Sequence, residues 1–178
     1  MQIERVTYET LEEIKDFYRT VVQKMCDEEI FLWDEIYPIE FLQKDIESNE
    51  LFCLRNNHEI LAAFTLCKTG DGAEAIEWSP ERDGENIFYL YRFAVNAHHK
   101  RTGLGSVALK HIFATAQKQG ATTVRFFVET QNLPALSFYK KQGIAQRPGL
   151  YVEEVDENLT LREYGFEKDL TGYERNAL

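Results

Sequence analysis

The stretch that decides the fold runs from residue 87 to residue 106 and reads IFYLYRFAVNAHHKRTGLGS. Its first nine residues, 87–95, are apolar and aromatic, which predicts a long buried strand. Two cations and two glycines follow, and apolar residues then recur at helical spacing over 103–119, as far as Gly120. The first turn of such a helix carries unpaired N–H groups and a partial positive charge. The pattern therefore favours a phosphate site.

The charge distribution agrees with an anion site at this turn. The chain has a formal net charge of −10, yet it has no Asp or Glu between His98 and Val128. The lysines and arginines of this interval are Lys100, Arg101, Lys110, Lys118 and Arg125. An acidic chain lacks the basic surface that nucleic acids require, and we expect it to attract a cationic small molecule instead.

Composition excludes several other classes of protein. No apolar run is long enough to cross a membrane, and the N-terminus lacks the pattern of a signal peptide. The three cysteines share no CxxC spacing, so we expect no disulfide framework and no bound metal. We expect a soluble, cytoplasmic, single domain over residues 1–178.

Periodicity along the chain predicts a mixed α/β architecture. Helices are predicted at 10–25, 39–46, 103–119 and 132–143, and strands at 3–8, 51–54, 60–66, 87–95, 123–128, 150–155 and 161–166. Thr10–Glu13 resembles a capping box, and a short strand is expected at 75–78 within the loop 69–85. The order of elements predicts a single mixed, mostly antiparallel sheet with a central parallel strand pair and helices on both faces.

A dinucleotide site is the rival interpretation of the glycine turn. The stretch from Gly103 to Ala108 matches GxGxxG/A, and Glu129 ends the next strand. That interpretation needs a tight turn from strand to helix, yet seven residues separate Val95 from Gly103. It also expects repeated βα units, which the antiparallel-looking first half does not supply.

Two motifs at the right mutual spacing resemble those of the GNAT superfamily of N-acetyltransferases, over about a third of the chain, residues 90–144. The first motif is Phe93-Ala94-Val95 followed by Lys100-x-x-Gly103-x-Gly105. The second is Asn132-x-x-Ala135-x-x-Phe138-Tyr139-x-x-x-Gly143-Ile144. Lys100 replaces the usual Arg or Gln, and Ile144 replaces the usual Phe. A lysine still offers a positive charge to phosphate.

The resemblance implies an acyl-CoA N-acyltransferase-like fold with acetyl-CoA (coenzyme A) as the cofactor. The implied cofactor-binding residues are Phe93, Ala94, Val95, Lys100, Arg101, Thr102, Gly103, Leu104, Gly105, Ser106, Asn132 and Tyr139. The backbone around 93–95 would pair with pantetheine and stabilise the oxyanion, and the N–H groups of 100–106 would hold the diphosphate. Tyr139 would lie near the sulfur as general acid.

That role agrees with the chemistry of acyl transfer. The leaving thiol has a pKa of about 8.5, and a tyrosine hydroxyl with a pKa of about 10 can protonate the thiolate. The amine must lose a proton, and Glu77 or Glu129 is the candidate base, although either could be a solvated acid. Trp33 and Tyr37 could line the acceptor pocket or pack in the core. Arg92 could orient the acceptor or pair with a buried acid.

The leading hypothesis is an N-acetyltransferase that acetylates a primary amine of a small cationic molecule by direct transfer in a ternary complex. One alternative is a non-catalytic acyl-CoA-binding or sensing domain on the same scaffold. A further alternative is a small NAD(P)-binding oxidoreductase built on the Gly103 loop. The C-terminal strands could also pair between subunits and form a homodimer.

Overall fold

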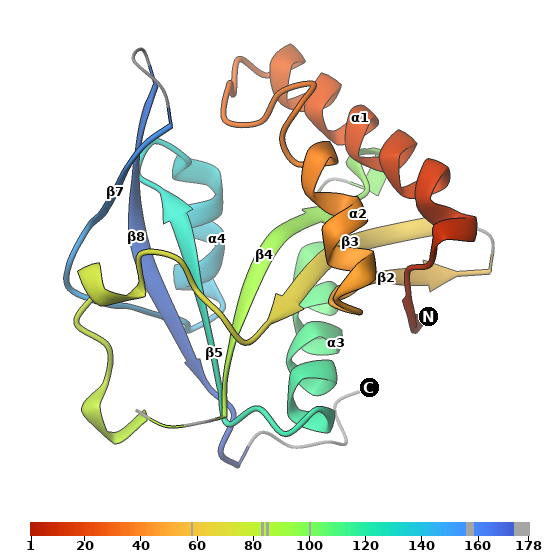
Figure 1. Cartoon of the computed structure of the whole chain (residues 1–178). Coiled ribbons are helices and arrows are strands. Elements are labelled where there is room, and N and C mark those ends of the chain that lie inside the picture. The colour runs from red at the N-terminus through yellow and green to blue at the C-terminus, as the bar shows by residue number, and fades with distance from the viewer. Residues whose placement is uncertain (58, 83, 85, 100, 156–158, 173–178) are drawn as a thin grey trace. The chain divides into compact units, whose positions relative to one another are not determined.

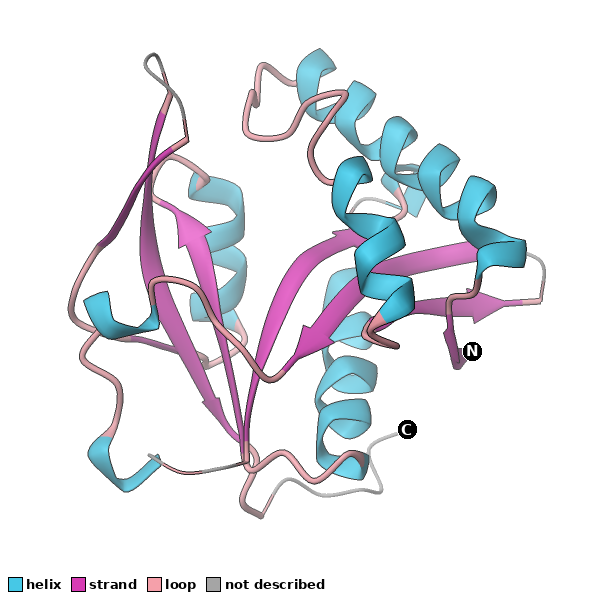
Figure 2. Cartoon of the chain, viewed as in Figure 1, coloured by secondary structure: helices cyan, strands magenta, loops and turns pink. Residues whose placement is uncertain are grey.

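A computed structural model describes residues 1–57, 59–82, 84, 86–99, 101–155 and 159–172 (Figures 1 and 2). The chain divides into two compact units. The first unit comprises Met1–Leu66 and Leu90–Thr115, and the second comprises Cys67–Tyr89 and, among the described residues, 116–172. The boundary passes within strand β4 (Ile87–Val95) and helix α3 (Leu104–Lys118). Whether residues 1–178 form a single domain stays a prediction.

The strands of the described chain form one mixed sheet. Their hydrogen-bonded order is β1-β2-β3-β4-β5-β8-β6, and β7 pairs with β8. The bounds of the other strands are β1 (Gln2–Arg5), β2 (Leu51–Asn56), β3 (Glu59–Cys67), β5 (Thr123–Glu129), β6 (Ala145–Gln146), β7 (Tyr151–Glu154) and β8 (Thr160–Asp169). β4 and β5 are parallel, with Ile87 opposite Thr123, while β8 pairs antiparallel with β5, β6 and β7. This confirms the predicted mostly antiparallel sheet with a parallel pair.

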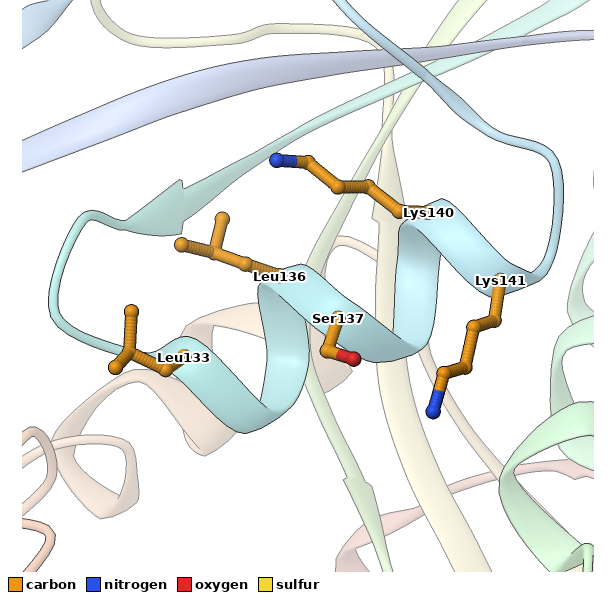
Figure 3. A pocket seen from close by; sticks show the side chains of 5 residues that line it. All are labelled: Leu133, Leu136, Ser137, Lys140 and Lys141. Atoms are coloured by element: carbon orange, nitrogen blue, oxygen red, sulfur yellow. The ribbon is translucent and has the colours of Figure 1, made fainter.

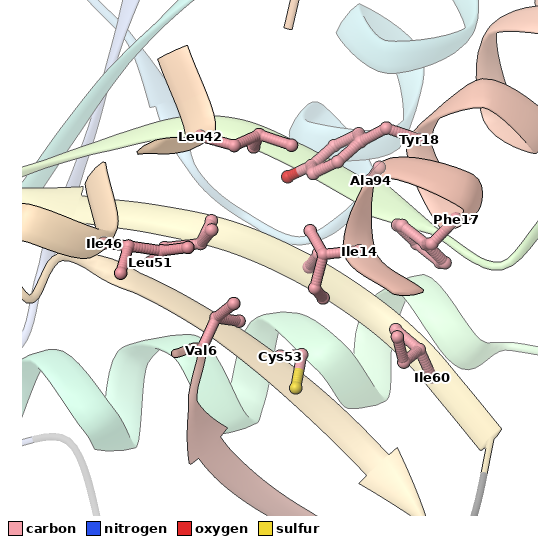
Figure 4. Close-up of a cluster of buried hydrophobic side chains, with 11 residues drawn as sticks. Val6, Ile14, Phe17, Tyr18, Leu42, Ile46, Leu51, Cys53, Ile60 and Ala94 are labelled. Carbon is pink, nitrogen blue, oxygen red and sulfur yellow. The ribbon is translucent and has the colours of Figure 1, made fainter. Parts of the chain in front are cut away.

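In the first unit, helices cover both faces of the strands. Helices α1 (Leu11–Asp27) and α2 (Leu42–Glu47) contribute to a buried cluster on one face. Its labelled side chains are Val6, Ile14, Phe17, Tyr18, Leu42, Ile46, Leu51, Cys53, Ile60 and Ala94 (Figure 4). A second cluster contains Leu104 and Ala108 of α3 together with Leu54, Leu61 and Ala62. The apolar face predicted for 103–119 is therefore the face that α3 buries.

The start of α1 differs from the prediction. A single 3-10 turn, η1 (Tyr8–Thr10), precedes the helix, and the Thr10 side chain forms no cap on α1. The Thr10 hydroxyl instead donates to the Thr7 carbonyl and accepts from the Thr7 N–H, both at 3.2 Å. The predicted capping box at Thr10–Glu13 is wrong because Thr10 already lies inside a helical turn.

In the second unit, different elements cover the two faces of β5 and β8. Helix α4 (Leu133–Lys141) packs on one face, where Tyr139 contacts the rings of Phe126 and Phe166. The segment that contains the 3-10 turns η3 (Ala73–Ala75) and η4 (Pro80–Arg82) lies on the other face. The strand expected at 75–78 is wrong: only Ile76 forms a bridge, to Gly149, because residues 73–75 are already coiled into η3.

Candidate functional site

The backbone of β4 changes direction at Arg92. Arg92 has a φ of +50°, a left-handed conformation that side chains with a Cβ rarely adopt in a strand. The next three residues of the strand alternate between its two faces. Ala94 packs with α1 and α2 on one face, whereas Phe93 and Val95 pack with α3 on the other. Phe93, Ala94 and Val95, three of the residues predicted to bind the cofactor, therefore directly follow a strained position, the kind of backbone feature that clusters at functional sites.

Arg92 itself is bound to a buried carboxylate. Its guanidinium donates from Nε and from a terminal nitrogen to the two oxygens of Asp45, at 2.9 and 2.7 Å. Of the two roles that the sequence left open for Arg92, the structure shows the pairing with a buried acid. Asp45 lies in α2 and was not predicted from the sequence as a site residue.

The turn before α3 is open to solvent. Arg101, Thr102 and Gly103 are exposed, whereas Leu104 is buried where the helix begins. Gly103 has a φ of +84°, and a Cβ built there would meet nothing within 4 Å. The glycine is thus required for its backbone conformation, which costs an L-residue free energy. Lys100, a predicted phosphate ligand, lies outside the described residues.

This turn fits an anionic group such as a diphosphate. Helical geometry leaves the N–H groups of the first turn without intrahelical acceptors, and the helix dipole adds partial positive charge. Gly105 and Ser106 are half-buried, and the N–H of Ser106 bonds the Gly103 carbonyl at 3.0 Å. Because no bulky side chain crowds Gly103, an anion can approach this backbone closely.

The segment between α1 and α2 forms a chain of aromatic contacts. Trp33 contacts Tyr18 at 6.1 Å between ring centroids and Tyr37 at 5.8 Å, and Tyr37 contacts Phe41 at 5.5 Å. Trp33 and Tyr37 are half-buried, while the nearby Phe31 is 75% exposed. The two predicted acceptor-pocket residues thus pack against each other and still keep part of their surface accessible.

In the second unit, Tyr139 is enclosed by aromatic rings. The ring centroids of Phe126, Phe138 and Phe166 lie 4.6, 5.2 and 5.7 Å from that of Tyr139. Burial raises the pKa of the Tyr139 hydroxyl, so it stays protonated at neutral pH. Among the described residues the hydroxyl has no hydrogen-bond partner, which leaves it available to donate.

Asn132 opens α4 as its N-cap. Its side-chain oxygen accepts a hydrogen bond from the N–H of Ala135 at 3.2 Å, and Pro134 lies in the first turn. This confirms the predicted start of the helix. The cap uses the oxygen as an acceptor and leaves the amide NH2 group able to donate to a ligand.

One side of α4 carries a groove with two positive charges. The groove has a volume of about 510 Å³ and is lined by Leu133, Leu136, Ser137, Lys140 and Lys141. Figure 3 shows the two lysines reaching away from the helix in different directions near its C-terminal end. In a chain of net charge −10, this groove is a local site suited to an anionic group.

The two carboxylates predicted as bases differ in their surroundings. Glu129, half-buried at the end of β5, accepts hydrogen bonds from the N–H of Gln131 and from the Thr130 hydroxyl, the latter at 3.3 Å. Glu77 is exposed, and its backbone carbonyl accepts a bond from Arg147 at 3.1 Å. The role of either residue as a base stays a prediction.

Glu163, a half-buried carboxylate on β8, was not predicted from the sequence. Glu163 is the direct cross-strand partner of Glu129, so the two side chains share one face of the sheet. Burial, together with the charges of Glu153 and Glu129, raises the pKa of Glu163 to about 7. The proximity of Glu163 to Glu129 depends on the register of β5 and β8. The sequence alone shows only a glutamate within a predicted strand.

The parallel pair β4–β5 within a mostly antiparallel sheet, and the turn before α3, define an acyl-CoA acyltransferase type of fold. A sequence profile of the acetyltransferase (GNAT) family matches residues 9–144. The chain therefore belongs to the GNAT acetyltransferase family. This confirms the resemblance read from the two motifs and extends it into the N-terminal half.

Solved structures agree on the fold. A putative acetyltransferase from Staphylococcus aureus Mu50 is 18% identical with a TM-score of 0.67, over 96% of this chain and 99% of that one. The ribosomal-protein-S18-alanine N-acetyltransferase of Escherichia coli is 16% identical with a TM-score of 0.62, over 99% and 98%. The PaiA N-acetyltransferase of Thermoplasma acidophilum, in complex with coenzyme A, is 20% identical with a TM-score of 0.62, over 94% and 98%. No helix in the described residues is long and apolar enough to cross a membrane.

Proposed function

We propose that this protein transfers the acetyl group of acetyl-CoA to the primary amine of a small cationic molecule, by direct transfer in a ternary complex. The observation that carries the proposal is the exposed turn at Arg101–Gly103, which leads into α3 a few residues after β4, the strand that contains the strained Arg92. Family membership supports the reaction class, and the acidic net charge supports a cationic acceptor.

We propose cofactor contacts within each unit separately, and the cofactor supplies an activated acetyl thioester when bound. In the first unit, those N–H groups of 101–106 that the turn leaves unpaired would hold the diphosphate, and the backbone of Phe93–Val95 would pair with pantetheine. In the second unit, the NH2 group of Asn132 would contact pantetheine, since the side-chain oxygen caps α4. Lys140 and Lys141 add positive charge for the remaining phosphate.

Two side chains of the second unit would handle the protons. The amine nitrogen attacks the carbonyl carbon, a C–N bond forms and the C–S bond breaks. Glu163 would accept the proton that the ammonium form of the acceptor loses. Tyr139 would donate its proton to the departing sulfur, and burial keeps that hydroxyl protonated until then.

Glu163 suits the role of base better than the two carboxylates predicted from the sequence. An effective base has a pKa close to the working pH, and the pKa of Glu163 is about 7. Glu129 accepts two local hydrogen bonds, and Glu77 is exposed to solvent. We propose that Glu129 and Glu153 supply negative charge that attracts the cationic acceptor. The role of Trp33 and Tyr37 as acceptor contacts stays a prediction from the sequence.

Calorimetry and a thiol-release assay test the proposal. We expect binding of acetyl-CoA and coenzyme A but not of NADH, and thiol release with small diamines exceeding that with neutral amines or with peptides bearing a free N-terminus. Binding of NADH alone would support the oxidoreductase alternative, and binding of coenzyme A without turnover on any amine would support a sensing domain. Tyr139→Phe should lower turnover at least tenfold, whereas Tyr164→Phe, a half-buried tyrosine on β8, serves as the control.

A cytoplasmic location is part of the proposal. The predicted homodimer, through the C-terminal strands, stays a prediction.

A further inference from the structure

The left-handed conformation of Arg92 is held by contacts from three elements of the first unit. The carboxylate of Asp45, on α2, accepts hydrogen bonds from Nε and from a terminal nitrogen of the Arg92 guanidinium, at 2.9 and 2.7 Å. Thr65 of β3 donates its hydroxyl to the same carboxylate at 2.8 Å. The Phe41 ring lies 5.2 Å from the guanidinium carbon. Asp45 is 5% exposed, so this is a buried, fully partnered cluster rather than a surface ion pair.

The backbone of Arg92 is fixed as well. The hydroxyl of Tyr18, on α1, donates a 2.7 Å hydrogen bond to the Arg92 carbonyl oxygen. Tyr18 is completely buried beside Leu42 in the cluster under α1 (Figure 4). Burial raises the pKa of the Tyr18 hydroxyl, which therefore remains protonated and able to donate at neutral pH.

Peptide planarity connects this contact to the proposed site. The Arg92 carbonyl and the Phe93 N–H belong to one rigid trans peptide group and point in opposite directions. Tyr18 fixes the carbonyl on the α1 side, so the Phe93 N–H points to the side away from Tyr18. Asp45 anchors the Arg92 side chain, so both the side chain and the carbonyl of this residue are bound while its φ is +50°.

We propose that Tyr18 and Asp45 are positioning residues that aim the Phe93 N–H at the carbonyl oxygen of the thioester, where negative charge develops during transfer. This proposal rests on the proposed acetyltransferase function. A donor fixed before the reaction stabilises the developing charge without reorganising, so the arrangement acts on turnover more than on binding.

Backbone conformation can be separated from side-chain loss by comparing glycine with alanine at position 92. Glycine adopts a φ of +50° without strain, whereas alanine does not. Both remove the guanidinium, so each is made together with Asp45→Asn, which avoids an uncompensated buried charge. We expect Arg92→Gly to retain at least fivefold more turnover than Arg92→Ala, although glycine is the poorer residue for a strand.

Tyr18→Phe is the second variant, and it removes a single oxygen from a buried ring. We expect kcat to fall at least tenfold, while KM for acetyl-CoA and Kd for coenzyme A change less than threefold. In ¹⁵N-phenylalanine-labelled protein without ligand, the amide resonance of Phe93 should shift in Tyr18→Phe. Tyr8→Phe, which removes a hydroxyl bonded to Glu47 at the surface, is the control and should leave kcat and the Phe93 resonance unchanged.

Each outcome decides between the proposals. If wild-type protein neither binds coenzyme A nor releases thiol, the proposed function fails and the positioning proposal fails with it. If wild type is active, an unchanged kcat in Tyr18→Phe overturns the positioning proposal alone. The same holds if turnover of the Arg92→Ala protein equals or exceeds that of the Arg92→Gly protein. A loss of thermal stability without a change in kcat would assign Tyr18 a structural role only.

Discussion

Replacing Glu163 by glutamine should stabilise the protein, and the gain should depend on pH. The pKa of Glu163 is raised from 4.5 to about 7 because the folded protein buries it beside Glu153 and Glu129. The folded state therefore holds a proton that the unfolded state has lost in the interval between these two values. Across this interval the stability of the wild type falls as pH rises.

The magnitude follows from the two pKa values. The difference between 4.5 and about 7 corresponds to roughly 3 kcal/mol in the free energy of unfolding, an upper limit because the side chain is partly exposed. The penalty is absent below pH 4.5, grows between the two values and is complete above pH 7. Glutamine carries no charge, so the variant should be more stable than wild type by about 2–3 kcal/mol at pH 8 and nearly equal to it at pH 4.5.

Urea denaturation at pH 4.5, 6 and 8 measures this difference. Glu154→Gln, at an exposed position on β7, is the matched control and should show no pH-dependent gain. A gap between Glu163→Gln and wild type that stays constant over this range would refute the reasoning, because a packing change does not follow the ionisation of one carboxylate.

Three further predictions concern the proposed reaction and the packing of the second unit. The value of kcat/KM should rise with pH through about 7 as Glu163 loses its proton, and this rise should be absent in Glu163→Gln; an unchanged profile would exclude Glu163 as the base. Gly103→Ala should weaken coenzyme A binding about tenfold in calorimetry, since a left-handed φ costs an L-residue about 1–2 kcal/mol; wild-type affinity would contradict the proposed role of the turn. Gly165→Ala should lower the free energy of unfolding by about 1–3 kcal/mol, because the new Cβ would lie 2.6 Å from Ile76 and 2.8 Å from Trp78. Urea denaturation measures this change, and a variant as stable as wild type would show that the two side chains move aside at little cost.

Strong local signals made the centre of the fold predictable. The apolar run at 87–95 matches β4 throughout, and Gly120 and Gly143 follow the ends of α3 and α4 closely. The shortest elements could not be predicted: β6 has two residues, too few for any periodicity, and it forms only because β8 lies alongside. Its existence is a property of the sheet rather than of its own sequence.

Residues of the candidate site could be predicted where a local motif contains them, and could not where their role depends on residues distant in the sequence. Asn132 and Tyr139 were found because both belong to one motif within eight residues of sequence. Asp45 and Glu163 were missed because their importance depends on distant partners. Asp45 meets Arg92 across 47 positions in the chain, and Glu163 meets Glu129 only through the register of two strands.

Two carboxylates on the same face of β8 show why Glu163 is better explained by function than by stability. Glu167 is 6% exposed and is satisfied by Arg125 at 2.8 Å and by the N–H of Ser79 at 3.3 Å. Glu163, four positions earlier, has no cationic partner among the described residues and faces Glu129 instead. The same face of β8 supplies a cationic partner to the buried Glu167, namely Arg125. The fold therefore does not require Glu163 to lack such a partner. A residue that lowers stability at neutral pH and titrates near pH 7 is suited to accept a proton from an incoming ammonium group, whose positive charge would also supply the missing partner.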